Sequence, residues 1–442
     1  MRCLLIANAH VLSVVEDKAT VIADQEVLIA GNRIESVQPS GQADPSHFDA
    51  LIDAGGKLVM PGLINCHAHV PMVLWRGLAE DVSIDRWFND FMWPLEHNLQ
   101  PEDVYWGMLL GLIEQIEAGV TSVADHYFHM EHAVRAVEKA GTRALLGYAM
   151  FGSQGLAMVE ETARFVADYQ GAANGRIRTI MAPHAPYTCD GDFLRASAQA
   201  ANKLGVGVHI HVSETPQQTT ASLRKRGITP LQVLEQTGIL DLPTILAHVC
   251  GATPDDIRLM EKYPVGIAHA VKTYLKLGEQ TAPLTEFLAA KLPVGLASDG
   301  AVSNSTLNLW EVLRLMALTQ KTRSGRGETL PIGQALAIAT RGSARVYGLP
   351  DDLGVVEPGY LADLILVDLS GAHHQPLFNV PASLVYNLQA PDVQTVIVDG
   401  QVIMRDRQLL TIDKAEVIAQ VRARMGRLAR LDPAMRIQTY DN

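Results

Sequence analysis

The stretch MPGLINCHAHV, residues 60–70, closes an apolar run with two histidines that are one residue apart. On an extended chain, side chains two positions apart point to the same side, so His67 and His69 are expected to leave a strand together. Two neutral imidazoles that converge in this way form part of a site for zinc or iron, which needs three or four ligands. A His-x-His pair also occurs without a metal, so further ligands have to come from elsewhere in the chain.

After Pro61 the chain alternates β-like apolar runs with helical patterns, which is typical of a parallel sheet. Eight β-like runs can be counted, the number that a closed (β/α)8 barrel requires. They are GLINCHAH (62–69), VTSVAD (120–125), ALLGYAM (144–150), IRTIMAPH (177–184), VGVHIHV (206–212), TILAHVCG (244–251), VGIAHA (265–270) and PVGLASDG (293–300). The sequence therefore predicts an α/β fold built on a TIM-like barrel.

The two ends of the chain share a different sequence pattern, which is typical of β-strands alone. Their β-like runs are TVIADQEVLIAG (20–31), NRIESVQ (32–38), LGVVEPGYLADLILVDL (353–369) and VQTVIVDGQVIMRDRQLL (393–410). Gly31–Asn32 and Gly400 are good hairpin signals. We therefore expect a small β-sandwich domain with a C-terminal helix, assembled from residues 1–60 and 350–442, beside a barrel over residues 61–349.

Composition and charge exclude several classes of protein. The formal net charge of −12 argues against nucleic acid or an anionic membrane as a partner, because both need clustered Lys and Arg. Four cysteines without a Cys-x-x-Cys pair indicate neither a disulfide framework nor a cysteine zinc site. The start, MRCLLIANAHVLSVVEDK, is poor material for a signal peptide, and no apolar run is long enough to span a membrane. We expect a cytoplasmic protein, and a neutral or cationic substrate remains compatible with its charge.

Ligand-type side chains stand at the ends of most of the predicted barrel strands, where the chemistry of such barrels is found. They are His67 and His69, His184, His211 with Glu214 following, His248 and Asp299. Independent structural histidines have no reason to gather at one end of separate strands. The imidazoles of the first and fifth strands and the carboxylate of the eighth can bind one divalent ion and leave a position for water. This set of metal ligands is His67, His69, His211 and Asp299.

HIHVSE, residues 209–214, offers a rival ligand, because His209 faces the same side as His211. We choose His211, which is nearer the strand end, and expect His209 to lie deeper in the barrel interior. Glu214 has the opposite parity and reaches the pocket only if the chain has already left the strand. The turn-prone SETP permits this.

The motifs PGLINCHAH, HIHVSET, ILAHVCG and LASDGAVSNSTLNLW resemble the amidohydrolase superfamily, in particular its branch of methylthioadenosine/S-adenosylhomocysteine deaminases and triazine hydrolases. LGVVEPGYLADLILVDL resembles the returning β domain of the same family. The resemblance implies that the four ligands hold one zinc or iron ion and that Glu214, His248 and Asp299 are the catalytic residues. It also implies that the substrate pocket is lined by Glu214 together with Trp87, Glu96 and His184.

The reaction implied by this resemblance is hydrolytic removal of the amino group of an adenine-type nucleoside such as 5'-methylthioadenosine, S-adenosylhomocysteine or adenosine. Water activated by the metal attacks an electron-poor ring carbon, with Asp299 and His248 placed to accept its proton. Glu214 donates a proton to the neighbouring ring nitrogen and then helps to pass a proton to the departing amine. Ammonia leaves, and a carbonyl remains.

Two segments depart from the pattern of this branch. Deaminases that take S-adenosylhomocysteine have arginines after the third strand, whereas Tyr148 stands at the first of these positions here, in an apolar GYAMFG. We expect Tyr148 to contact the substrate. We also expect this loop to suit a nucleoside without a carboxylate better than S-adenosylhomocysteine. After the seventh strand the branch shows Asn-Pro and Ser-Asn, but this chain has AHAVKTYLKLG, where Lys272 and Tyr274 are either substrate contacts or a solvated and a packed side chain.

Two other functions stay open at this point. The same active site could hydrolyse a triazine, pterin or pyrimidine, because each has an electron-poor ring carbon. Alternatively, the chain could be a barrel that has lost catalysis and serves as an assembly protein, although every expected ligand is present. Zinc is expected as the metal, with iron as the alternative, and a homo-oligomer is compatible with the resemblance.

Overall fold

The eight predicted β-like runs form one parallel sheet in the computed structural model, which describes residues 3–431. The barrel strands are β6 (Leu63–His69), β7 (Val120–Tyr127), β8 (Arg143–Met150), β9 (Ile177–Pro183), β10 (Val208–Val212), β11 (Thr244–His248), β12 (Val265–His269), β13 (Val294–Leu296) and β14 (Asp299–Gly300). The last two are halves of the eighth strand. Because β13 pairs with β12 and β14 pairs with β6, the sheet closes on itself, and the predicted barrel is confirmed.

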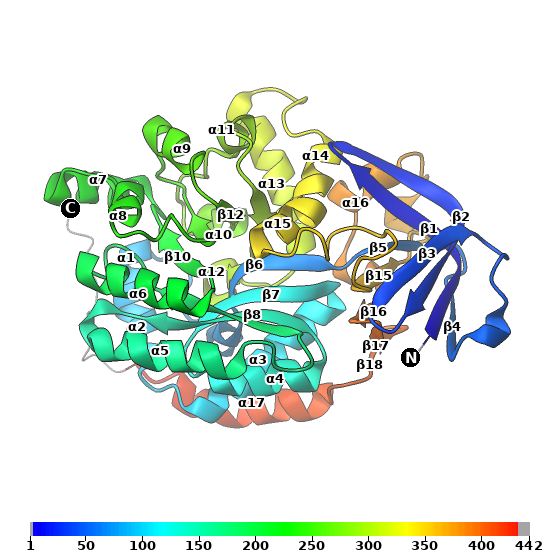
Figure 1. The fold of residues 1–442 in the computed structure, drawn as a ribbon, viewed down its shortest axis with the longest axis horizontal. Helices are drawn as coiled ribbons and strands as arrows, with labels where there is room; N and C mark the ends of the chain where they lie inside the picture. The colour runs from blue at the N-terminus through cyan, green and yellow to red at the C-terminus, as the bar shows by residue number, and fades with distance from the viewer. Residues whose placement is uncertain (1–2, 432–442) are drawn as a thin grey trace.

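Helices follow the strands and cover the outside of the barrel (Figure 1). They are α1 (Ile84–Arg86), α2 (Trp93–Glu96), α3 (Pro101–Glu117), α4 (Met130–Ala140), α5 (Leu156–Tyr169), α6 (Gly191–Leu204), α7 (Pro216–Arg226), α8 (Pro230–Gln236), α9 (Pro254–Met260), α10 (Val271–Lys276), α11 (Leu284–Ala289), α12 (Ala301–Asn304), α13 (Leu309–Ser324), α14 (Ile332–Ala337) and α15 (Ser343–Tyr347). Local chemistry sets their ends: α3 begins with Pro101 behind a Gln100/Asp103 capping box, and α4 ends at Gly141 in the left-handed conformation.

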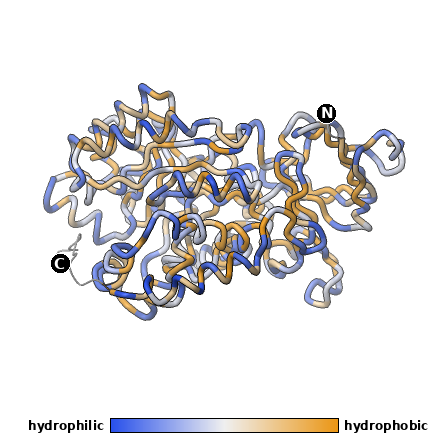
Figure 2. The backbone as a smooth tube through the Cα atoms, turned by 90° about the horizontal axis from the view of Figure 1, so that it is seen from below, coloured by the Kyte–Doolittle hydropathy of each residue, from blue (hydrophilic) through white to orange (hydrophobic). Residues whose placement is uncertain are grey.

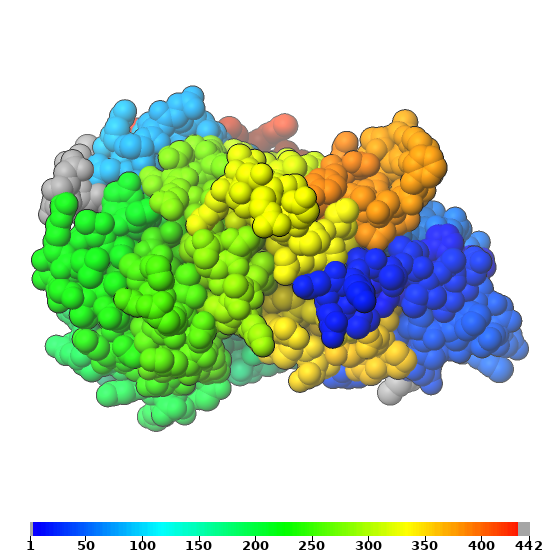
Figure 3. Space-filling view, turned by 90° about the horizontal axis from the view of Figure 1, so that it is seen from above, coloured from blue at the N-terminus to red at the C-terminus, as the bar shows by residue number. Residues whose placement is uncertain are grey.

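Strands from the two ends of the chain join in a second hydrogen-bonded sheet, as predicted. They are β1 (Cys3–Val15), β2 (Lys18–Ala30), β3 (Arg33–Pro39), β4 (Ala50–Asp53), β5 (Leu58–Pro61), β15 (Leu364–Val367), β16 (Val393–Val398), β17 (Gln401–Arg405) and β18 (Gln408–Leu409). The antiparallel pairing of β5 with β15 joins the two ends. Both predicted hairpins are present, at Gly31–Asn32 and at Asp399–Gly400. In Figure 3 this terminal sheet and its loops form a lobe beside the barrel.

Apolar residues fill both parts of the molecule. Figure 2 shows hydrophobic residues mostly along the inner segments of the chain and hydrophilic residues mostly along its outer loops. A buried ion pair joins the barrel to the terminal lobe. Arg143 at the start of β8 donates to both carboxylate oxygens of Asp363 at 3.0 and 2.9 Å. The same guanidinium donates to Asp399 at 3.0 Å. Because breaking a buried ion pair leaves an uncompensated charge, this contact fixes the barrel against the terminal sheet.

The C-terminal helix α17 (Lys414–Leu428) follows the terminal sheet in sequence but packs on the barrel, against α3. The remaining helix is α16 (Val380–Tyr386). We propose domain boundaries at residues 60/61 and 349/350, close to the end of β5 and of α15. Residues 1–2 and 432–442 of the proposed composite domain lie outside the described part of the chain. Within residues 3–431, every helix is too short or too polar to cross a membrane.

Candidate metal centre and active site

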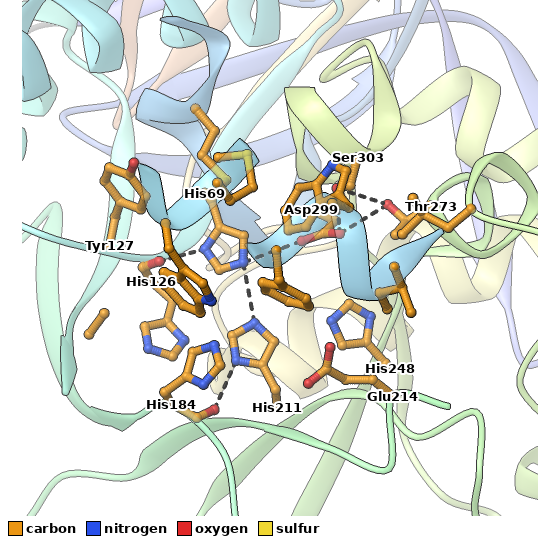
Figure 4. Close-up of a pocket in the computed structure, with 18 of the residues that line it drawn as sticks. His69, His126, Tyr127, His184, His211, Glu214, His248, Thr273, Asp299 and Ser303 are labelled. Carbon is orange, nitrogen blue, oxygen red and sulfur yellow. Dashed lines mark hydrogen bonds and ion pairs between the residues drawn. The ribbon is translucent and has the colours of Figure 1, made fainter. Parts of the chain in front are cut away.

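A deep pocket opens at the carboxyl end of the barrel strands, where sequence analysis expects the chemistry (Figure 4). It encloses about 800 Å³, including its open mouth. Predicted site residues that line it are His69, Trp87, Glu96, His184, His211, Glu214, His248 and Asp299. His67 lies beneath the pocket floor and is completely buried. The side chains that sequence analysis assigned to separate strands therefore come together, with Tyr148 as the exception.

The four predicted metal ligands converge at one point. The Nε2 atoms of His67 and His69 lie 3.4 and 3.3 Å from Oδ1 of Asp299. Nε2 of His211 lies 3.2 Å from Nε2 of His69. The ligand atoms of His67, His69 and His211 all lie within 4.8 Å of one another, and so do those of His67, His248 and Asp299. Five donor groups therefore surround one small volume.

Hydrogen bonds behind the rings fix which nitrogens face this volume. Nδ1 of His69 donates to the carbonyl oxygen of His126 at 2.6 Å, because a carbonyl can only accept. Nδ1 of His211 donates in the same way to the carbonyl oxygen of His184 at 2.9 Å. The two Nε2 atoms consequently face each other across 3.2 Å, an arrangement that a proton or a metal ion between them stabilises.

His67 and Asp299 are held by buried partners of their own. Nδ1 of His67 lies 2.8 Å from Nε2 of His209, so the rejected candidate His209 is the deeper support that its position predicts. Nε2 of His67 is buried without a hydrogen bond. Oδ2 of Asp299 accepts hydrogen bonds from Thr273 at 3.0 Å and from Ser303 at 2.7 Å, which leaves Oδ1 to face the imidazoles. Sequence analysis missed both hydroxyls, which come from helices after the seventh and eighth strands.

The electrostatics of the cluster fit a divalent cation. Burial lowers the pKa of His67 to about 3, so this ring is neutral and keeps a free lone pair. Although burial opposes protonation of His69, its hydrogen bond to the Asp299 carboxylate raises the pKa of His69 to about 9. The cluster thus attracts one positive charge even without a metal. Neutral imidazoles beside a carboxylate are the donors that zinc and iron prefer, so the residues fit such an ion.

Glu214 and His248 reach the pocket because the backbone turns sharply where their strands end. Ser213 has a φ of +46°, so the chain has left β10 before Glu214, as the SETP turn permits. His248 itself has a φ of +76°, which is costly outside glycine and is concentrated at functional sites. Tyr187, which sequence analysis missed, donates a hydrogen bond to Oε1 of Glu214 at 2.8 Å. This bond fixes the carboxylate at the pocket wall.

Glu96 lies on the other side of the pocket, at the end of α2, and Tyr127 donates to its Oε1 at 2.7 Å. Burial raises the pKa of Glu96 to about 7. The space between Glu96 and the metal cluster has an aromatic wall, of which sequence analysis found only Trp87. Its other members are Phe88, Trp93, Phe128 and Phe151. The ring of Phe151 stacks on His184 with centroids 4.6 Å apart.

The predicted contact of Tyr148 with the substrate has to be corrected. Strand side chains alternate between faces, and in β8 it is Ala149, followed by Phe151 just after the strand, that line the pocket. Tyr148 therefore points outward, where its ring packs on Phe165 of α5 with centroids 5.9 Å apart. Its parity on β8 places the side chain outside the barrel.

Lys272 and Tyr274 lie in different environments in the structure. Lys272 donates to Thr306 at 3.0 Å and pairs with Glu311 at 2.5 Å, away from the pocket. Tyr274 is buried and lines the pocket. His126 also lines the pocket.

Comparison with known proteins agrees with this geometry. Residues 58–403 match the model of the amidohydrolase family. The chain is 41% identical over 432 residues to a 5-methylthioadenosine/S-adenosylhomocysteine deaminase of Pelotomaculum thermopropionicum, which covers 97% of this chain and 99% of that protein.

Among solved structures, an adenosine deaminase from Xanthomonas campestris with bound zinc superposes with a TM-score of 0.90 at 29% identity, covering 96% of this chain and 98% of that one. An atrazine chlorohydrolase from Arthrobacter aurescens complexed with zinc superposes with a TM-score of 0.88 at 26% identity, covering 96% and 100% of the two chains. Both similarities span the barrel and the terminal sheet.

Proposed function

This chain belongs to the amidohydrolase family, and from that premise we propose that it hydrolyses the exocyclic amino group of an adenine-type nucleoside and releases ammonia. The protein is a hydrolytic deaminase that takes a divalent metal ion and acts on a small molecule. The choice of metal, the role of each residue and the identity of the nucleoside are proposals. One observation supports them most: imidazole nitrogens from separate strands converge beside the Asp299 carboxylate at the floor of an apolar pocket.

The proposed ligands of the ion are His67, His69, His211 and Asp299. Zinc is the proposed metal, because three imidazoles and one carboxylate suit it and because the superposed relatives are zinc proteins. When bound, the ion supplies Lewis-acid chemistry that makes water a good nucleophile at neutral pH.

The proposed proton transfers use groups that face each other across the pocket. His248 and Asp299 accept the proton of the attacking water. Glu214, whose carboxyl group Tyr187 orients, donates a proton to the ring nitrogen beside the attacked carbon. The resulting carboxylate then accepts the proton of the added hydroxyl as the carbonyl forms and passes it to the leaving amine, and the proton held by His248 and Asp299 restores Glu214. The buried setting keeps bulk water from competing for these protons.

The proposed nucleoside lies between the aromatic wall and the metal cluster. Trp87 and the neighbouring rings bury the flat base, and His184 holds its edge. The Glu96 carboxylate, oriented by Tyr127, accepts hydrogen bonds from the two ribose hydroxyls. Of these contacts, only the one from Glu96 uses a feature that an adenine nucleoside has and a triazine lacks, namely the ribose diol.

Ammonia release from a panel of compounds tests this proposal. The panel contains methylthioadenosine, S-adenosylhomocysteine and adenosine, together with a triazine, a pterin and cytosine as compounds without the adenine ring. Turnover of the adenine nucleosides supports the proposal. Turnover of the triazine, pterin or cytosine alone would replace it with the second enzymatic function, and silence with every adenine nucleoside would contradict the proposal.

Within this panel we predict a preference for methylthioadenosine over S-adenosylhomocysteine. Among the described residues, no lysine or arginine lines the pocket, so the homocysteine carboxylate has no cationic partner there. A missing hydrogen bond to a charged group corresponds to a kcat/KM lower by roughly 10- to 100-fold. The matched control is an adenosine thioether of similar length without the amino-acid group, which should behave like methylthioadenosine. Equal kcat/KM values for the two natural thioethers would contradict this prediction.

The C-terminal helix positions the segment that carries Glu96. Arg427 donates to the carbonyl oxygen of Asn98 at 2.5 Å and to both oxygens of Asp103 at 2.6 and 2.7 Å. Asn98 in turn donates to the carbonyl oxygen of Arg430 at 2.7 Å. These bonds clamp the chain two residues beyond Glu96 to α17.

Arg427→Met is therefore expected to raise KM for the nucleoside about tenfold while kcat changes little, because Glu96 loses its position and the metal cluster does not. Steady-state kinetics measure both constants. Arg422→Met, an exposed change on the same helix, is the matched control and should leave both unchanged. A fall in kcat with constant KM would show that α17 does not act through Glu96.

A further inference from the structure

A second cluster of metal-ligand side chains lies outside the barrel, on the terminal lobe. It consists of His373 and His374, just before α16, and Asp392, just before β16. Their ligand atoms lie within 4.8 Å of one another. The chain between β15 and β16, which carries the cluster, lies on the outer face of the lobe in Figure 3. None of the three residues belongs to the deaminase pocket.

We propose that His373, His374 and Asp392 form a second divalent-metal site, which takes zinc or a similar borderline cation. The Nε2 atoms of His373 and His374 both point at one carboxylate oxygen. Oδ2 of Asp392 lies 3.0 Å from Nε2 of His373 and 3.2 Å from Nε2 of His374. Two imidazoles and one carboxylate are a ligand set that zinc accepts, with solvent completing its coordination. His373 is partly exposed, with 37% of its side chain accessible, so an ion can enter.

Supporting contacts preorganise this cluster. The His374 ring is buried, and its Nδ1 lies 2.6 Å from Oγ of Ser383. A hydroxyl can donate or accept, so the ring can bond Asp392 through Nε2–H without metal, or bind a metal through Nε2 with Nδ1–H donating to Ser383.

The other two ligands are also held in place. The backbone N–H of Gln389 donates to Oδ2 of Asp392 at 2.7 Å, which fixes the carboxylate at the end of the short turn Ala390–Asp392. Gly371 leaves the space that the His373 ring fills, because a Cβ there would lie only 2.8 Å from Cε1 of that ring. A preorganised ligand set loses little conformational entropy on binding an ion. The expected effect of zinc is to tie the segment before α16 to the segment before β16.

Equilibrium dialysis of the purified holoenzyme against micromolar free zinc, followed by elemental analysis, tests the proposal. The wild-type chain is expected to hold two zinc ions per chain, and His373→Ala is expected to hold one while keeping wild-type deaminase activity. Because His373 is the most exposed ligand, this variant should fold. His47→Ala, which removes an exposed histidine of the same lobe, is the matched control and should keep two ions.

The outcomes separate the two sites. One ion per wild-type chain, or two ions retained by His373→Ala, would overturn the proposal and leave the cluster as a hydrogen-bonded clasp. Zinc should also raise the thermal unfolding midpoint of the wild-type chain and of His47→Ala, but raise that of His373→Ala less, because only the ion at the barrel remains. Equal shifts in all three proteins would likewise contradict the second site.

Discussion

His69→Gln is expected to lower deaminase turnover by at least about a thousandfold, because metal ions contribute several kcal/mol to such reactions. His69 is the proposed ligand whose Nε2 lies between Oδ1 of Asp299, at 3.3 Å, and Nε2 of His211, at 3.2 Å. Removing this imidazole takes away the central donor of the cluster. Elemental analysis should therefore show the ion at the barrel lost together with activity, and added zinc should restore little.

A surface histidine supplies the control for this prediction. His47→Gln changes an exposed ring, with 78% of its side chain accessible, and should keep both metal and turnover. Treatment of the wild-type enzyme with a chelator should reproduce the loss seen in His69→Gln, and zinc should reverse it. If His69→Gln retained its metal content and normal kcat, the four-ligand proposal would be wrong.

Glu214→Gln is expected to lower kcat by about 10²- to 10⁴-fold while the metal stays bound, because the change removes proton transfer and keeps the shape of the side chain. Tyr187 donates to Oε1 of Glu214 and can also donate to the amide oxygen, so the side chain stays in place. Kinetics and elemental analysis of the same preparation measure both effects. The combination of full metal content and low kcat distinguishes this variant from His69→Gln.

A second substrate separates proton transfer from a structural role. The 6-chloropurine riboside loses chloride, which needs no proton to depart, so Glu214→Gln should lose less activity with it than with methylthioadenosine. A merely structural role would lower both rates equally. Glu261→Gln, at an exposed site that follows α9, should leave both rates unchanged. Equal losses on the two substrates would contradict the role of Glu214 as a proton donor.

The metal cluster could be predicted from sequence because it depends on local periodicity and on one rule of barrels. His67 and His69 share a face of β6, and parallel strands bring their carboxyl ends to one rim. The choice between His209 and His211 followed from the same reasoning, and the structure places His209 behind His67 and His211 in the pocket. Each inference needed only the position of a residue along its own strand.

The substrate pocket was predicted less well. Tyr148 was expected in the pocket from its place in a loop motif, but the alternation of β8 turns it toward Phe165. The aromatic wall beyond Trp87 was missed, because Trp93 and Phe151 come from segments that meet only in the folded chain. Tyr187 and Ser303, which hold the proposed catalytic carboxylates, were missed for the same reason.

The sequence by itself determined the barrel, the joining of both chain ends in one sheet, and the set of proposed metal ligands, since strand periodicity and strand ends are properties of short segments. Only the tertiary structure decided which nitrogen of each imidazole faces the proposed metal site, which hydroxyls orient the carboxylates and which rings line the pocket. Those choices depend on hydrogen bonds and packing between residues far apart in the chain, such as Thr273 with Asp299 and Tyr127 with Glu96. Distances between distant segments are set by the packing of the whole core, which no single segment contains.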